Sequence, residues 1–252
     1  MTFRAVTDTA LVTQRNLKRL IRTPQLLVFS TIQPVMFTLL FVYVFGGAIR
    51  TPGLNYVDYL LPGILVQTTL FGGSATAIGL SQDLREGMID RFRSLPMSRM
   101  AVLAGRTLAD LLRNVFVIVL ILGVGSAVGF RFHGSFGASV AAFGCALLFG
   151  YAFSWCFAVV ALLVKEPESA QVASLLAIFP LVFASSAFVP TASMPEWLQV
   201  FTRHQPVSIT VGAVRALTQG TGAGTLPWAS VAWSLGILAV AAPLAVARYR
   251  RL

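Results

Sequence analysis

The residues whose types and spacing could do chemistry lie mainly in one stretch, residues 81–99, which reads SQDLREGMIDRFRSLPMSR. Its apolar side chains recur at intervals of four, four and three, so they share one face of a helix; they are Leu84, Met88, Phe92 and Leu95. Acidic and basic side chains fall on the other faces, and Pro96 would end the helix. Apolar anchors among charges of both signs favour docking on another protein, and the alternative is a solvated loop.

The residues predicted to form this docking surface are Leu84, Glu86, Met88, Asp90, Arg91, Phe92 and Arg93. Catalytic chemistry has much weaker support in the sequence. His133 and His204 both fall near the margins of apolar runs, and Ser74 has no histidine at a matching position. Neither lysine follows a glycine, so the phosphate-binding pattern GxxxxGK[ST] is absent. We therefore expect no cofactor or metal in this chain and no enzyme activity of its own, with an intramembrane enzyme as a remote alternative.

The composition indicates that the elements holding this stretch lie in a lipid bilayer. Of the 252 residues, 56% are hydrophobic and 11% are charged, and the mean hydropathy is +0.79. A soluble domain has about 25% charged residues. The net charge of +10 could suggest a nucleic-acid partner, but such a protein would need a charged, soluble fold. An all-α integral membrane protein is the better interpretation.

Apolar segments predict six transmembrane helices, since a hydrocarbon core of about 30 Å needs roughly 20 helical residues. They span about 26–48, 57–80, 107–129, 137–163, 170–189 and 227–247. Asp110 and Arg113 fall at the start of the third, where we expect arginine to reach the membrane surface. Fifteen of the 19 lysines and arginines lie on the side of the two termini and of residues 81–99. The positive-inside rule therefore predicts cytoplasmic termini.

Two further segments are predicted outside the spans of this single domain. Residues 1–23 form an amphipathic helix with arginines opposite an apolar face, which would lie flat in the membrane interface. Residues 190–226 are apolar and interrupted by Pro195 and Pro206, each of which can open a short helix, and the second would end near Gly220. We expect two short re-entrant helices on the outer side, or alternatively a surface cap.

The spans have few charges near their middle, which argues against a proton- or sodium-coupled carrier. Aromatic and amide side chains instead suit an amphiphilic or aromatic molecule, although phenylalanine is also common in helices that face lipid. The residues predicted to line a substrate path are Phe37, Phe41, Gln67, Phe71, Phe179 and Phe183.

Two motifs, together with this topology, make the chain resemble an ABC-2 type permease over essentially its whole length. Residues 86–98, EGMIDRFRSLPMS, are similar to the family's charged loop, with Met88 where threonine is common. Residues 189–217 contain VP, MPEWLQ, QPVS and AVRAL in the family's order, with Gln205 where asparagine is common. The resemblance is to the daunorubicin- and doxorubicin-resistance branch.

The resemblance implies the membrane subunit of an ATP-binding-cassette exporter in a bacterial inner membrane. Residues 83–95 would form a cytoplasmic coupling helix seated on a separate ATPase subunit, which would bind ATP and magnesium, and Pro167 would face the same subunit. A second permease chain, identical or related, would complete the pathway in the membrane lipid. The cargo would be an amphiphilic drug or lipid-like molecule leaving the cell, and lipid or polysaccharide export by the same superfamily is the alternative.

Overall fold

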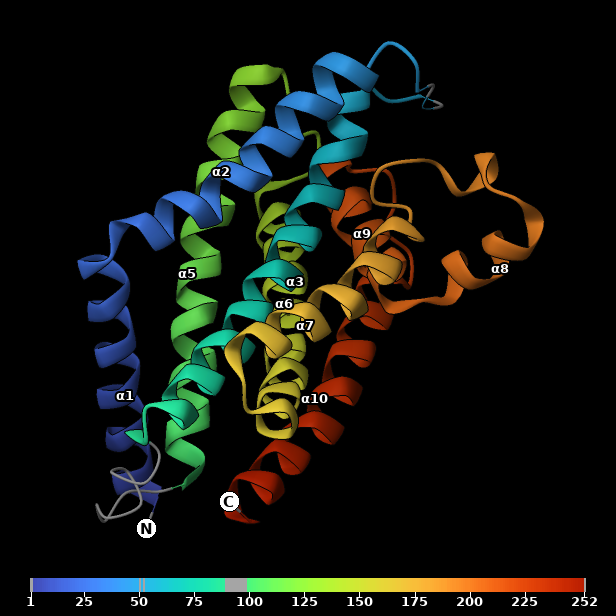
Figure 1. The fold of residues 1–252 in the computed structure, drawn as a ribbon. Helices are drawn as coiled ribbons and strands as arrows, with labels where there is room; N and C mark the ends of the chain where they lie inside the picture. The colour runs from blue at the N-terminus through green and yellow to red at the C-terminus, as the bar shows by residue number, and fades with distance from the viewer. Residues whose placement is uncertain (1, 50, 52, 89–98, 252) are drawn as a thin grey trace.

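The computed structural model describes residues 2–49, 51, 53–88 and 99–251, and within these ranges the chain folds into helices joined by turns (Figure 1). The elements, in chain order, are α1 (Thr2–Arg22), α2 (Pro24–Leu40), the π-helical turn η1 (Phe41–Phe45), α3 (Tyr56–Arg85), α5 (Arg99–Val128), α6 (Phe136–Val164), α7 (Pro167–Phe183), the 3₁₀ turn η2 (Thr191–Ser193), α8 (Glu196–His204), α9 (Pro206–Gln219) and α10 (Leu226–Arg251).

Helix α3 is the central element, and α5, α6, α7 and α9 all pack against it. Every residue from 60 to 70 is buried, which requires neighbours on all sides of the helix. By contrast, α10 exposes large apolar side chains such as Trp233 and Val240, a surface suited to lipid. Helix α3 is therefore enclosed by its neighbours, whereas α10 lies at the periphery of the bundle.

Helices occur at each of the six positions predicted to cross the membrane, but only part of that prediction is confirmed. Four are long and apolar enough to span a bilayer: Tyr56–Arg85, Met100–Val128, Phe136–Val164 and Leu226–Arg251. The first and fifth predicted spans correspond to the shorter apolar helices Thr31–Phe45 and Pro167–Phe183. The beginning of α1, the end of α3 and the end of α10 lie at one end of the bundle (Figure 1).

The fifth predicted span was extended too far, because α7 ends at Phe183 rather than near residue 189. The side chain of Gln205 explains this end. Its Nε2 donates to the carbonyls of Leu181 and Ala184, each at 2.9 Å. These are carbonyls that a helix end leaves without an intrahelical partner. Gln205 therefore caps α7 from the start of α9.

The helix predicted at the N-terminus is present as α1, and it runs alongside α5 (Figure 1). Val12 is 4% exposed, and the Thr13 hydroxyl donates to the carbonyl of Gly105 at 3.2 Å. Arginines of α1 also reach a carboxylate of α3, as described below, and these contacts hold the helix against the bundle.

Residues 190–226 contain the two short helices that the prolines predicted. Pro195 precedes α8, and Pro206 is the first residue of α9. Gly220 ends α9 in the left-handed conformation, with φ of +67°. Helix α9 is packed into the bundle with a buried apolar face, whereas α8 projects from its side (Figure 1). The guanidinium of Arg215 in α9 lies 3.6 Å from the ring centre of Tyr59 in α3.

Candidate functional site

The predicted docking stretch is only partly described, and its first turn differs from the prediction. Leu84 belongs to the last turn of α3, which ends at Arg85. Gly87 then adopts φ of +66°, a left-handed conformation that an α-helix cannot continue through. Leu84 and Met88 therefore do not share one continuous helix over residues 83–95. Asp90, Arg91, Phe92 and Arg93 lie outside the described residues, as do Leu95 and Pro96.

A group of buried charges adjoins this stretch, between α1, α3 and α5. Asp83, two residues before the end of α3, is 5% exposed. Its carboxylate accepts from Arg106 of α5 at 3.3 Å, and from Arg15 and Arg19 of α1 at 3.4 and 3.5 Å. One acidic side chain therefore joins three helices. We call the set Asp83, Arg106, Asp110 and Arg113 the charge network.

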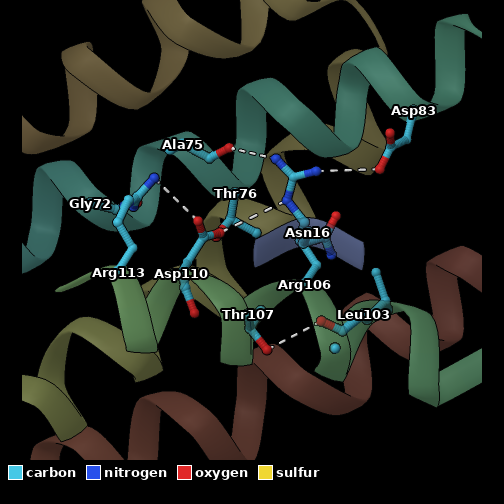
Figure 2. A network of polar contacts seen from close by, with 12 residues as sticks. Asn16, Gly72, Ala75, Thr76, Asp83, Leu103, Arg106, Thr107, Asp110 and Arg113 are labelled. Carbon is cyan, nitrogen blue, oxygen red and sulfur yellow. Dashed lines mark hydrogen bonds and ion pairs between the residues drawn. The ribbon is translucent and has the colours of Figure 1, made fainter. Parts of the chain in front are cut away.

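The charge network continues along α5 toward the middle of the bundle. Nη1 of Arg113 lies 3.2 Å from Oδ1 of Asp110, while Nε of Arg106 lies 3.9 Å from Oδ2 of the same residue. Thr76 of α3 donates its hydroxyl hydrogen to Asp110, and Arg113 donates to the carbonyl of Gly72. Figure 2 shows these side chains spread along the surface where α3 and α5 meet.

Two glycines of α3 make room for one arginine and one amide side chain of α5. A Cβ atom at Gly72 would lie 1.9 Å from Oδ1 of Asn114, and a Cβ at Gly79 would lie 1.4 Å from Nη2 of Arg106. A side chain at either position would have to displace Asn114 or Arg106. The close approach also lets Arg106 donate to the carbonyl of Ala75 at 3.4 Å. Polar groups of α5 thus bind the backbone of α3 directly.

This arrangement corrects two sequence-based interpretations. We expected few charges inside the helical bundle, and we expected Arg113 to extend to the membrane surface. Arg113 and Asp110 are instead 8% and 7% exposed and pair with each other. Burial of two charges is tolerated where they are paired and hydrogen-bonded. The sequence did contain a sign of this pairing, because the charged residues 106, 110 and 113 are spaced to lie on one helical face.

A cavity of about 350 Å³ lies beside the charge network, walled by α2, α3, α5 and α7. Arg113 belongs to its wall as well as to the network. Three of the six residues predicted to line a substrate path are in the wall, namely Gln67, Phe71 and Phe179. The cavity combines apolar and aromatic surface with a few polar side chains, which is the usual character of a small-molecule site.

The other predicted path residues lie outside this wall but belong to one connected group of rings. The Phe71 and Phe179 ring centres are 6.1 Å apart, and those of Phe179 and Phe183 are 5.5 Å apart. Phe188 continues the group, 5.4 Å from Phe183 and 4.6 Å from Phe41. Phe37 then stacks on Phe41 at 5.9 Å. Sequence reasoning did not assign Phe188 to the path, although the fifth predicted span, about 170–189, included it.

The two histidines are held by hydrogen bonds at separate places. Nδ1 of His133 lies 2.9 Å from Oε1 of Gln219, and Nδ1 of His204 lies 2.8 Å from the carbonyl oxygen of Val200, in its own helix. Among the described residues, no group of three His, Cys, Asp or Glu side chains is positioned to hold a metal ion. The wall of the cavity offers hydrogen-bonding and aromatic groups to a ligand.

These features define a class of protein: a multi-pass helical membrane protein with a cavity inside its bundle and a buried polar network beside it. Comparison with known proteins gives the family. Residues 7–218 match the family model described as ABC-2 type transporter, so the chain belongs to that family and is a transporter permease.

Individual relatives agree with this assignment. The chain is 35% identical over 227 residues to the "Daunorubicin resistance ABC transporter permease protein DrrB1" of Streptomyces coeruleorubidus, covering 90% of this chain and 80% of that protein. It is 29% identical over 251 residues to the "Probable doxorubicin resistance ABC transporter permease protein DrrC" of Mycobacterium tuberculosis, covering 98% and 89%. It is 20% identical to the "Probable multidrug ABC transporter permease YbhR" of Escherichia coli, over 79% of this chain and 54% of that protein.

Proposed function

We propose that this chain is the membrane subunit of an ATP-driven exporter that moves an amphiphilic drug or lipid-like molecule out of a bacterial cell. Six helices would cross the inner membrane, with both termini in the cytoplasm. A separate ATPase subunit would bind ATP and magnesium and would contact residues 81–99. A second permease chain, identical or related, would complete the conduit. Relatives named for daunorubicin and doxorubicin resistance support this class of cargo.

The observation that carries the proposal is the continuity between the end of α3 and the cavity. Asp83 lies two residues before the end of α3, within the proposed docking stretch of residues 81–99, and binds Arg106. Arg106 and Arg113 flank Asp110, and Arg113 is part of the cavity wall. A displacement of residues 81–99 by the ATPase would therefore act on side chains that reach the binding cavity.

A double charge reversal in the docking stretch tests the proposal. Glu86 is exposed at the end of α3, and Asp90 lies outside the described residues. We expect Glu86→Lys/Asp90→Lys to abolish ATP-dependent doxorubicin accumulation in everted membrane vesicles that contain the chain and candidate ATPase subunits from the same genome. Reversed charges would repel the groups that set the register of docking. Copurification of the ATPase would fall as well.

Glu196→Lys is the matched control, because Glu196 is an exposed acid on α8, far along the chain from this stretch. Vesicles with the Glu196→Lys variant should accumulate as much doxorubicin as vesicles with the unmodified chain. Unchanged accumulation in the double variant would remove residues 81–99 from the transport mechanism. Vesicles that transport a fluorescent lipid but exclude doxorubicin would instead identify the cargo as lipid.

A further inference from the structure

The cavity has a polar feature that the family assignment does not explain. Each of its four surrounding helices contributes one side-chain amide to the wall: Gln33 from α2, Gln67 from α3, Asn114 from α5 and Gln171 from α7. A side-chain amide carries both donors and an acceptor without net charge. The four amides together can therefore pair with hydroxyl groups, which also donate and accept.

The charges around the cavity are balanced. Arg113 is the charged residue of the wall, and Asp110 pairs with it at 3.2 Å while Gly72 accepts another of its hydrogen bonds. None of the described residues that form the wall carries a carboxylate. A ligand with a permanent charge would lose water there without gaining a free counter-ion. The site therefore favours an uncharged polar group.

Gln67 has unmet hydrogen-bonding capacity in the wall. The residue is 4% exposed, and its Oε1 is buried with no hydrogen-bond partner among the described residues. Leaving a buried amide oxygen unpaired is unfavourable. Asn114 is better supplied, since its Nδ2 donates to the carbonyl of Thr69, although at a long 3.4 Å. A hydroxyl donor from a ligand would satisfy the Gln67 oxygen after rotation of the side-chain amide.

Aromatic rings complete the site. Phe71 and Phe179 both line the cavity, and their rings meet at 87° with centres 6.1 Å apart. A flat ring can lie against one of them and contact the edge of the other. We propose that each copy of the chain holds a recognition site for an uncharged, hydroxyl-bearing aromatic group, and that Gln67 is the residue that selects the hydroxyl. This inference rests on the proposed permease function.

Binding of matched naphthalenes to the full chain in phosphatidylcholine nanodiscs tests the inference. The probes are 2,6-dihydroxynaphthalene, 2,6-dimethoxynaphthalene and naphthalene-2-sulfonate, measured by equilibrium dialysis at pH 7 with lipid-only discs subtracted. The dihydroxy probe should bind about tenfold more tightly than the dimethoxy probe, since the latter cannot donate to Gln67. The sulfonate should bind most weakly.

Variants separate recognition from folding. Gln67→Leu should weaken binding of the dihydroxy probe about tenfold, while the affinity for the dimethoxy probe changes less than twofold. Gln67→Glu places a carboxylate in the wall and should shift preference toward 2-(aminomethyl)naphthalene, which is a cation. Gln14→Leu replaces an exposed amide of α1 and should leave the affinities for the dihydroxy and dimethoxy probes unchanged.

Equal binding of the dihydroxy and dimethoxy probes to the unmodified chain would overturn the inference. Tightest binding of the sulfonate would also overturn it, and so would equal weakening of both neutral probes by Gln67→Leu. These measurements need neither ATP nor an ATPase. The binding inference can therefore be refuted while ATP-dependent efflux is observed, and it can be confirmed while efflux is absent.

Discussion

Replacement of Asp83 by asparagine should destabilise the protein, chiefly by leaving Arg106 without its nearest carboxylate. The carboxylate of Asp83 accepts from three arginines at 3.3–3.5 Å. Arg15 and Arg19 have side chains 36% and 44% exposed, so water can solvate them after the change, and their pairs contribute little. The Arg106 side chain is only 15% exposed and would lose its nearest carboxylate.

The size of the effect follows from Arg106. Breaking a buried ion pair by removing one partner costs about 3–5 kcal/mol. Oδ2 of Asp110 remains 3.9 Å from Nε of Arg106, so part of the charge stays compensated. We expect Asp83→Asn to lower the free energy of unfolding by about 2–3 kcal/mol. For a chain of this size, the melting temperature should fall by about 4–12 °C.

Thermal unfolding of the purified chain in detergent, followed by fluorescence-detected size exclusion, measures this fall. Glu196→Gln removes an exposed acid and should leave the melting temperature unchanged. The double variant Asp83→Asn/Arg106→Gln removes both buried charges and should lose less stability than the two single changes combined. A melting temperature equal to that of the control, or additive losses in the double variant, would refute the reasoning.

Two other changes test the packing around the site. Gly79→Val should displace Arg106, because a Cβ at residue 79 would lie 1.4 Å from Nη2 of Arg106, and the melting temperature should fall. Gly123→Val is the control, because a Cβ at residue 123 would meet no atom within 4 Å, and it should leave the melting temperature unchanged. Equal melting temperatures for both valine variants would argue against the close approach of α3 and α5. Gln205→Ala removes two 2.9 Å hydrogen bonds and should cost about 1–3 kcal/mol, with faster hydrogen exchange in the last turn of α7 as the local readout. Exchange there at the unmodified rate would contradict the capping role.

Apolar segment lengths predicted where the helices lie, because a bilayer imposes a minimum run of apolar residues. Sequence signals for the start and end of a helix were reliable where one proline or glycine determines the backbone conformation. Pro206 begins α9 and Gly220 ends it. The end of α7 was not predictable in this way, because a distant side chain, Gln205, provides the cap. The turn at Gly87 was missed because the apolar spacing continued across it.

The charge network was missed for a different reason. Asp110 and Arg113 lie near the end of an apolar run, where charged side chains usually reach water. Their burial depends on the small side chains of the facing helix, which repeat at residues 72, 75, 76 and 79. The two patterns are visible separately in the sequence. Only the packing of α3 against α5 brings them together.

Three of the six residues predicted to line a substrate path, Gln67, Phe71 and Phe179, lie together in the wall of the cavity. Asn114 and Arg113 were not assigned to it, since contacts between different helices determine which face of each helix points inward. The sequence contains the helical periodicity, whereas the pairing of helix faces comes from the folded bundle.

The central claim is that this chain conducts its cargo while another subunit hydrolyses ATP. Doxorubicin uptake into proteoliposomes is the most direct measurement, with the permease alone, the ATPase subunit alone, and both together, each with ATP or a non-hydrolysable analogue. The account predicts uptake only when both subunits and ATP are present. Vectorial uptake by the permease alone, driven by a proton or sodium gradient, would contradict it.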